Sequence, residues 1–244
     1  MEWLINKNIA HRGLHSNDFR VPENSLLAFR LAVEKNISIE LDVHALKDGT
    51  VVVFHDDNLK RMTGVDKKIS ECTYEEIRKL KLLDSNQTIP LLAEVFDLVN
   101  NKVPILIEIK NTSKLGYLER RLLSILKKYN GRCAIQSFNP FSLIWFRINA
   151  NYIYRGQLSS YFIHEKLFFM KKCLIKKLFF NFLVKPNFIS YNIENLPNKR
   201  VRKIREKGIP IFGWTIRNEY EYKKAKMYCD SIIFENINVG SEIT

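Results

Sequence analysis

The stretch Glu40-Leu41-Asp42-Val43, followed by Asp48-Gly49 and then by Val53-Phe54-His55-Asp56, decides how this chain folds. Alternate residues of a strand point to the same face, so the carboxylates of Glu40 and Asp42 share one side. Asp-Gly is a strong signal for a two-residue hairpin loop, and counting outward from it places Asp42 directly opposite His55. Opposed residues of an antiparallel pair project to the same side. The stretch therefore predicts one surface that carries two carboxylates and an imidazole.

Short apolar runs alternate with segments of helical period along the whole chain. The expected strands are Asn8–His11, Ile37–Val43, Val103–Ile109, Arg132–Ser137, Ile153–Gln157, Phe188–Tyr191, Ile209–Trp214 and Ser231–Phe234, with Thr50–His55 as a returning hairpin arm. The expected helices are Glu23–Lys35, Thr73–Lys81, Leu91–Asn100, Tyr117–Tyr129, Pro140–Asn149, Arg200–Lys207 and Glu219–Tyr228. Thr73 with Glu76 three residues later predicts a capping box.

This alternation predicts an α/β fold, a (β/α)₈ TIM barrel with a β-hairpin extension after the second strand. An open doubly wound sheet would carry a Gly-rich phosphate loop after the first strand, and this chain, with nine glycines, has none there. No internal repeat or linker divides the 244 residues, which fit one barrel domain over residues 1–244.

Polar residues occur where the expected strands end. They are His11, Glu40 with Asp42, Glu108 with Lys110, Gln136 and Trp214. In a barrel of this kind the carboxyl ends of all strands open on one face, where such enzymes carry their chemistry. The pattern therefore predicts an active site at that face.

Composition narrows the class of protein further. The formal net charge of +13 is explained either by lysines spread over solvated helix faces or by attraction to phosphate-bearing partners. The four cysteines form no Cys-x-x-Cys pair, which argues against a zinc site and a disulfide framework. Neither a membrane span nor a signal peptide is visible in the sequence, so we expect a cytoplasmic location.

Eight short motifs follow one another along the chain. They are Ala10-His11-Arg12-Gly13, Pro22-Glu23-Asn24-Ser25, Glu40-Leu41-Asp42-Val43, Lys47-Asp48-Gly49, His55-Asp56, Glu108-Ile109-Lys110, Gln136-Ser137-Phe138 and Trp214-Thr215. In this order the chain resembles the glycerophosphodiester phosphodiesterases, from residue 9 to about residue 235. The resemblance implies a (β/α)₈ barrel that hydrolyses small-molecule glycerophosphodiesters with a divalent metal. Two departures are Leu46, where Thr is usual, and Ile233–Asn236, where the family ends its last strand with Thr-Asp.

Glu40, Asp42 and Glu108 are the candidate metal ligands. Carboxylates are hard ligands that suit Mg²⁺ or Ca²⁺, and no thiolate cluster favours zinc. The alternative is a buried ion-pair network around Lys110 or Arg12, since buried carboxylates are costly unless they are paired. The choice between Mg²⁺ and Ca²⁺ stays open, because it depends on ligand number and site flexibility.

His11 and His55 are the candidate catalytic residues, because imidazole titrates near neutral pH. Cleavage of a phosphodiester requires one proton to be removed and one to be delivered, and the sequence does not say which histidine does which. Arg12 is expected to bind a phosphate oxygen through two donors. Lys110 should share a face with Glu108 and add positive charge.

Three further residues are candidates for substrate binding. Glu23 is placed beside the site by the resemblance, whereas Asn24 or Ser25 is expected to cap a helix. Gln136 and Trp214 are expected as pocket walls, with Trp214 packing against an alcohol head group such as a choline cation.

The segment 161–185 mixes apolar residues with lysines. It predicts either a peripheral contact with an anionic membrane or, as the pattern favours, a crossover helix with lysines extending to solvent. Two other functions are alternatives: a phospholipase-type barrel acting on lysophospholipids or phosphoinositides, and a basic non-catalytic binding protein. No nucleic-acid motif stands out. The sequence leaves the alcohol head group and the oligomeric state open.

Overall fold

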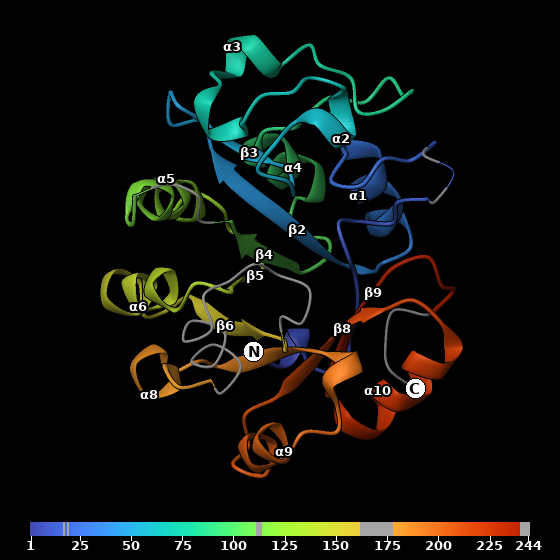
Figure 1. Ribbon diagram of the computed structural model, residues 1–244, viewed down its shortest axis with the longest axis vertical. Coiled ribbons are helices and arrows are strands. Elements are labelled where there is room, and N and C mark those ends of the chain that lie inside the picture. Colours follow the sequence, from blue (N-terminus) through green and yellow to red (C-terminus); the bar gives the residue numbers. More distant parts are fainter. Residues whose placement is uncertain (17, 19, 111–113, 162–177, 240–244) are drawn as a thin grey trace. The chain divides into compact units, whose positions relative to one another are not determined.

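The computed structural model describes residues 1–16, 18, 20–110, 114–161 and 178–239, and they form two compact units. The N-terminal unit is Ala10–Cys133. The C-terminal unit combines Met1–Ile9 with Ala134–Thr244. Each has its own strands and helices, which Figure 1 colours along the chain. The organisation of residues 1–244 as a single domain stays a prediction.

The N-terminal unit is built on strands that the sequence predicts. β1 (Asn8–Ala10) ends where this unit begins. The unit contains β2 (Ser38–Ala45), β3 (Val51–Val53) and β4 (Ile105–Ile109), with helices α1 (Leu26–Glu34), α4 (Leu92–Val99) and α5 (Tyr117–Leu126). β2 pairs in parallel with β4 and antiparallel with β3. Every residue of β2 and β4 is buried, as is usual for parallel strands that are covered on both faces.

The register of the β2–β3 hairpin differs by one residue from the predicted register. Val43 pairs with Val53, and Phe54 N donates to Asp42 O over 3.0 Å. Asp42 therefore lies opposite Phe54, and the predicted direct opposition of Asp42 and His55 is wrong. His55 follows β3 and lies outside the ladder.

The cause is the length of the turn, which takes three residues rather than two. Leu46 N donates to Thr50 O over 2.8 Å, so Lys47–Gly49 form the loop. Gly49 has a φ of +88°, and Asp48 Oδ1 accepts a hydrogen bond from Thr50 N over 2.9 Å. A three-residue loop with glycine in the left-handed region is the next most common hairpin after the two-residue one.

Residues 57–91, called the excursion, leave the hairpin and return to α4, and their apolar side chains share a core with Leu46, Val52 and Phe54 of the hairpin. They carry α2 (Lys60–Thr63) and α3 (Tyr74–Ile77). The buried side chains of this core are Leu46, Val52, Phe54, Leu59, Met62, Ile69, Cys72, Ile77, Leu82 and Ile89. The capping box at Thr73 is confirmed, since Thr73 N donates to Glu76 Oε2 over 2.7 Å. The helix is shorter than predicted, because the chain turns into a β-bridge between Lys81 and Thr88.

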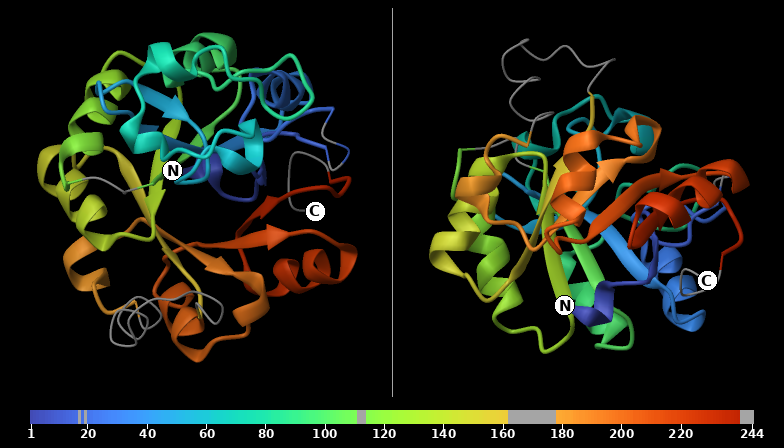
Figure 2. Two further views of the ribbon diagram at one scale, coloured as in Figure 1. Left: turned by 45° about the horizontal axis from the view of Figure 1, so that its top comes forward. Right: turned by 90° about the horizontal axis from the view of Figure 1, so that it is seen from below.

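The C-terminal unit is a parallel sheet with helices between its strands (Figure 2). Its strands are β5 (Cys133–Ser137), β6 (Tyr154–Ser159), β7 (Phe188–Asn192), β8 (Ile211–Ile216) and β9 (Ser231–Phe234), which neighbour one another in that order. Its described helices include α6 (Pro140–Asn149), α8 (Asn181–Val184), α9 (Lys199–Arg205) and α10 (Glu219–Tyr228). Gly156 is required on β6, because a Cβ there would lie 2.0 Å from the ring of Phe188.

All the predicted strands are confirmed, β9 with the predicted ends and the others with slightly different ones, and α6 and α10 occupy the predicted ranges. The short helix α2 was not predicted, whereas α8 lies within the segment 161–185, where a crossover helix is expected. Of the segment 161–185, residues 162–177 lie outside the described residues. No helix in the described part of the chain is long and apolar enough to cross a membrane.

Candidate active site

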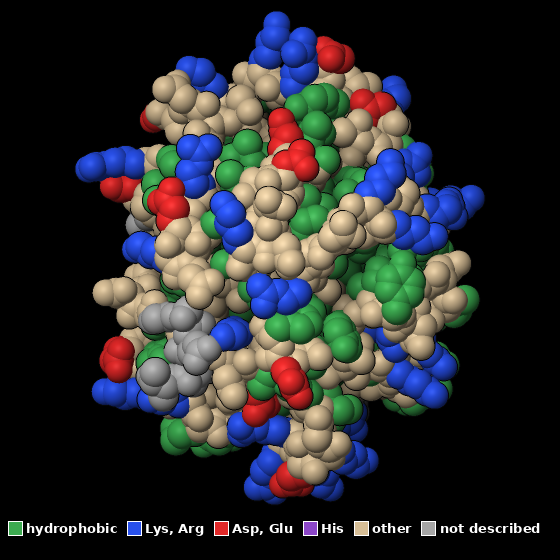
Figure 3. All heavy atoms as spheres, turned by 180° about the vertical axis from the view of Figure 1, so that it is seen from behind, with side chains coloured by type: hydrophobic (Ala, Val, Ile, Leu, Met, Phe, Trp, Pro, Cys, Tyr) green, Lys and Arg blue, Asp and Glu red, His purple; other side chains and the backbone are tan. Residues whose placement is uncertain are grey.

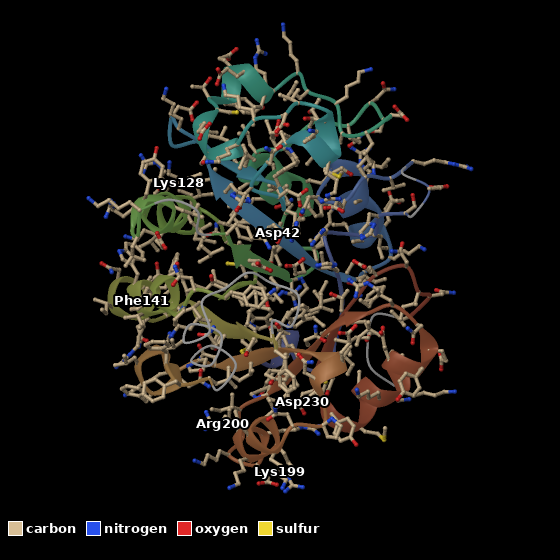
Figure 4. The ribbon with its side chains drawn as sticks, viewed as in Figure 1. Asp42, Lys128, Phe141, Lys199, Arg200 and Asp230 are labelled. Carbon is tan, nitrogen blue, oxygen red and sulfur yellow. The ribbon has the colours of Figure 1, made fainter. Side chains whose placement is uncertain are left out.

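The parallel pairing of β2 with β4 brings the three predicted metal ligands together in the N-terminal unit. Asp42 pairs with Glu108, and Glu40 lies two residues before Asp42 on the same face. One oxygen from each of the three carboxylates lies within 4.8 Å of the others. Asp42, labelled on β2 in Figure 4, is 0% exposed, Glu40 is 1% exposed and Glu108 is 7% exposed. The predicted clustering of these three side chains is confirmed.

The loop after β1 delivers a backbone donor to this cluster. Arg12 has a φ of +56°, and its N–H donates to Glu40 Oε2 over 3.1 Å. A left-handed conformation is unfavourable for a residue with a side chain, and such strain is typical of functional sites. Gly13 follows with a φ of +80°, and a Cβ there would lie 2.9 Å from the Cβ of Ala28. The close packing against α1 therefore fixes this loop.

Asn24 is a site residue that the sequence interpretation missed. Ser25 is the helix cap, because its Oγ accepts the N–H of Ala28 over 3.2 Å. The side chain of Asn24 is instead buried and donates from Nδ2 to Asp42 Oδ2 over 2.9 Å. The available signal was the place of Asn24 next to Glu23 in the motif Pro22-Glu23-Asn24-Ser25, but that motif fits the start of a helix equally well.

Two cationic side chains lie against the carboxylates. Lys110 Nζ is 3.1 Å from Asp42 Oδ1 and 2.6 Å from Glu108 Oε1. Arg12 Nε is 3.4 Å from Asp42 Oδ2, and its Nη1 donates to Glu23 Oε1 over 2.8 Å. Burial opposes the charge of Lys110, but Asp42 and Glu108 hold its pKa above the usual range. Both cations are therefore permanent parts of the site.

The carboxylates differ in their ionisation. Burial raises the pKa of Glu40 well above its usual value, and the charges of Asp42 and Glu108 raise it further. Burial also raises the pKa of Glu108, although Lys110 opposes this. Burial opposes the ionisation of Asp42 as well, but Lys110 and Arg12 hold the pKa of Asp42 far below its usual range. The cluster thus carries more acidic groups than its cations balance.

This donor set fits a hard divalent cation. Three buried carboxylates face two cationic side chains, and burial together with the charges of Asp42 and Glu108 raises the pKa of Glu40. Asp42 Oδ1 is buried and accepts no hydrogen bond, although Lys110 is nearby. An oxygen ligand set of this kind suits Mg²⁺ or Ca²⁺.

His55 is oriented by the next residue in the chain. Its Nδ1 lies 2.6 Å from Asp56 Oδ1, and its ring is partly exposed. Burial opposes the ionisation of Asp56, but hydrogen bonds from His55 and Arg61 hold the pKa of Asp56 well below its usual range. Because an ionised carboxylate only accepts, the proton lies on Nδ1, and Nε2 takes no part in this contact.

His44 and His11 are two further histidines of this unit. His44 is buried, which lowers its pKa, and its Nε2 lies 3.2 Å from His55 O. The neutral ring of His44 therefore donates to the His55 carbonyl and supports its backbone. His11 directly follows β1. Burial raises the pKa of Asp42, and His11 helps to lower it, after the larger effects of Lys110, Arg12 and His55.

Arg61, on α2 of the excursion, is a second residue that was missed. It donates from Nη1 and Nη2 to the two oxygens of Glu23 over 3.0 and 2.7 Å. It also donates from Nε and Nη2 to the two oxygens of Asp56 over 2.6 and 3.0 Å. Such forked contacts are the strong form of an ion pair. Arg61 thus connects the carboxylate that holds His55 with the carboxylate that holds Arg12.

Replacing Arg61 with alanine should lower kcat/KM about tenfold, because groups behind the reacting residues typically contribute 10- to 100-fold. Arg61→Lys should recover only part of this, since lysine lacks the fork. Arg78→Ala is the matched control, because Arg78 is similarly exposed and forms a 2.6 Å ion pair with Glu75 away from these groups. Equal effects of Arg61→Ala and Arg78→Ala on kcat/KM would contradict the role of Arg61 in holding Asp56 and Glu23.

Gln136 and Trp214 belong to the C-terminal unit. Gln136 on β5 is buried, and its Oε1 accepts a hydrogen bond from Ser190 Oγ over 2.7 Å. Trp214 on β8 meets Phe138 edge to face at 5.6 Å, and its Nε1 has no hydrogen-bond partner in the described structure. Their predicted role as pocket walls stays a prediction.

Comparisons with known proteins agree with this architecture. The chain is 32% identical over 249 residues to a glycerophosphodiester phosphodiesterase of Caldanaerobacter subterraneus, covering 93% of each chain. It is 29% identical to mouse lysophospholipase D GDPD1, covering 91% of this chain and 80% of the relative. A solved Oleispira antarctica phosphodiesterase, in complex with the product sn-glycerol-3-phosphate, matches with a TM-score of 0.79 and 24% identity. That match covers 94% of this chain and 93% of the solved chain.

The protein thus has the (β/α)₈ barrel fold that the sequence predicts, with a β-hairpin after the second barrel strand. Residues 11–239 match the family described as the glycerophosphoryl diester phosphodiesterase family. With that match and the Caldanaerobacter relative, the chain belongs to this family and is a phosphodiesterase.

Proposed function

We propose that this chain hydrolyses glycerophosphodiesters to sn-glycerol 3-phosphate and an alcohol, with a divalent cation and histidine acid–base catalysis. The observation that carries the proposal is the buried cluster of Glu40, Asp42 and Glu108 with its two cations. The names of the Caldanaerobacter and Oleispira relatives support the substrate and the product.

The carboxylates of Glu40, Asp42 and Glu108 would hold the cation, with Asn24 orienting Asp42 through its amide. Mg²⁺ or Ca²⁺ bound there would supply positive charge that polarises the phosphate and offsets the charge of the transition state. Both ions accept such oxygen ligands, and the assay below distinguishes them.

The chain's own cations and histidines would do the remaining work. Arg12 and Lys110 lie at the cluster and would bind phosphate oxygens as the substrate enters. His55, with its proton fixed on Nδ1 by Asp56, would transfer a proton through Nε2. His11 would serve the second proton transfer, and Glu23 would hold Arg12 in place.

Other expectations stand as predictions beside this proposal. Gln136 and Trp214 would line the alcohol side of the site, and the cytoplasmic location is also a prediction. Peripheral membrane contact through 161–185 falls mainly on residues outside the described part of the chain. Figure 3 shows Lys and Arg side chains scattered over one face, which supports a generally basic surface as the source of the net charge.

A second candidate substrate is a lysophospholipid, which the name of the mouse relative favours. The chemistry at the phosphate would be the same, and the difference would lie in the apolar chain on the glycerol. A direct comparison of glycerophosphocholine with lysophosphatidylcholine separates the two.

The first assay uses metal-stripped protein with glycerophosphocholine, with and without Mg²⁺ or Ca²⁺, and measures released glycerol 3-phosphate. We expect release only with added metal, and chelator should abolish it. Release of choline from lysophosphatidylcholine alone would favour the second candidate. A folded sample inactive on both substrates with either metal would contradict the proposal.

A further inference from the structure

Large apolar side chains are exposed on neighbouring helices of the C-terminal unit. Phe141 on α6 is 52% exposed and Phe182 on α8 is 63% exposed. Phe179 just before α8 and Ile148 near the end of α6 are exposed as well. α6 and α8 lie side by side in Figures 1 and 2, and Figure 4 labels Phe141 on α6. This gathering is unusual, because exposed apolar residues normally occur singly.

The aromatic rings form one connected cluster. Phe141 contacts Phe180 with ring centroids 5.7 Å apart. Phe179 contacts Phe180 and Phe182, each at 5.8 Å. We call these four rings the aromatic cluster. Its ring contacts join α6 to the start of α8, and three of its rings, Phe141, Phe179 and Phe182, are exposed.

A cationic cavity is formed by the other ends of the same helices. It has a volume of about 480 Å³ and is lined by Arg147, Asn151, Arg155, Lys185 and Asn187. Arg147 is on the last turn of α6, and Lys185 directly follows α8. The lining contains three cationic side chains, two amides and no carboxylate.

The positive charge of this cavity has no carboxylate partner in the described structure. Arg155 is 4% exposed, and its Nε and Nη2 donate to the carbonyls of Val184 and Lys185 over 2.9 and 3.0 Å. Arg147 donates to the carbonyl of Leu183. Burial lowers the pKa of Arg155, and the charge of Arg147 lowers it further. Arg155 Nη1 also donates to the carbonyl of Asn151 over 3.5 Å, so backbone carbonyls hold this guanidinium in place while its charge stays without an acid among the described residues. Because the lining carries three cationic side chains and no carboxylate, the cavity is suited to an anion.

The aromatic cluster and the cationic cavity are parts of one surface. Arg147 precedes the exposed Ile148 on α6, and its guanidinium binds the carbonyl of Leu183 next to the exposed Phe182. Lys185 follows two residues after Leu183. Aromatic rings beside basic side chains are the combination that binds at the interface of an anionic bilayer.

The geometry points to a docking surface for an anionic lipid bilayer, with the aromatic cluster in the interface and a lipid phosphate in the cationic cavity. The complementarity of charge favours an anionic over a neutral membrane. A nucleic-acid surface would place its aromatic rings along a basic groove for stacking, whereas these rings pack on one another. This inference goes beyond the proposed reaction and does not depend on it.

The test is co-sedimentation of the full chain with vesicles of phosphatidylcholine, with or without phosphatidylglycerol. We expect binding to the vesicles with phosphatidylglycerol, and about tenfold or more weaker binding for Lys185→Glu and for Phe182→Ser. The matched controls are Lys199→Glu on α9 and Tyr220→Ser on α10, which replace exposed residues of the same types elsewhere in the unit. These controls should bind vesicles as the unchanged protein does.

All four variants alter exposed side chains, so their melting temperatures and their hydrolysis of soluble glycerophosphocholine should match those of the unchanged protein. Absence of binding to phosphatidylglycerol vesicles would overturn the inference. Equal losses for Lys185→Glu and Lys199→Glu would also overturn it, since net charge alone would then explain the binding. The inference would also be overturned if Lys185→Glu weakened the binding of a single-stranded oligonucleotide but not the binding of vesicles.

Discussion

Replacing His55 with alanine should lower kcat by about 100-fold or more, and His11→Ala should have an effect of the same order. The reason is that each substitution removes one of two proton transfers that phosphodiester cleavage requires. His55 is partly exposed, and the chain around it is held by the buried strands of the hairpin. The melting temperature should therefore change little, and the loss should appear in turnover.

His164→Ala is the control, because no role is predicted for that histidine. The activity of this variant should be normal. Added imidazole should restore part of the activity of His55→Ala if proton transfer is what is missing. Near-normal turnover of either catalytic variant, measured on correctly folded protein, would rule out the role assigned to that histidine.

The second large effect is expected for Asp42→Asn. This change keeps the size of the side chain but removes the charge that binds Lys110, Arg12 and the proposed cation. We expect activity to fall about 100-fold or more and the half-saturating metal concentration to rise at least tenfold. Metal binding should be measured directly by calorimetry, since it reports the site without relying on turnover.

Asp66→Asn is the matched control, because Asp66 is exposed and forms a 2.9 Å ion pair with Lys60 on the excursion. It should leave both metal affinity and activity unchanged. If Asp42→Asn binds metal as tightly as the unchanged protein, the three carboxylates form an ion-pair network with Lys110 and Arg12, which was the alternative from the sequence.

The carboxylate cluster was predictable because its placement follows from periodicity. Residues two apart on a strand share a face, and parallel strands bring their carboxyl ends together, so Glu40, Asp42 and Glu108 had to meet. The position of His55 was harder to predict, because the pairing register of a hairpin depends on the length of its turn. One extra loop residue at Lys47 moved Asp42 opposite Phe54.

Asn24 and Arg61 were not predictable by the same means. Asn24 precedes the helix cap, and only the left-handed backbone at Asn24, with a φ of +54°, directs its amide to Asp42. Arg61 lies on a four-residue helix with no periodicity to detect, and it reaches Glu23 across a gap of 38 residues in sequence. Contacts of this kind depend on tertiary packing rather than on a local pattern.

The excursion has a consequence for how this enzyme would lose activity under stress. Its apolar core packs on Leu46, Val52 and Phe54 of the hairpin, and its local unfolding would leave the pairing of β2 with β4 in place. Opening would withdraw Arg61 from Asp56 and Glu23, so His55 would lose its support while the carboxylate cluster remained assembled. Loss of activity on heating would then precede global denaturation. The temperature of inactivation would be set by residues 57–91 rather than by the barrel strands.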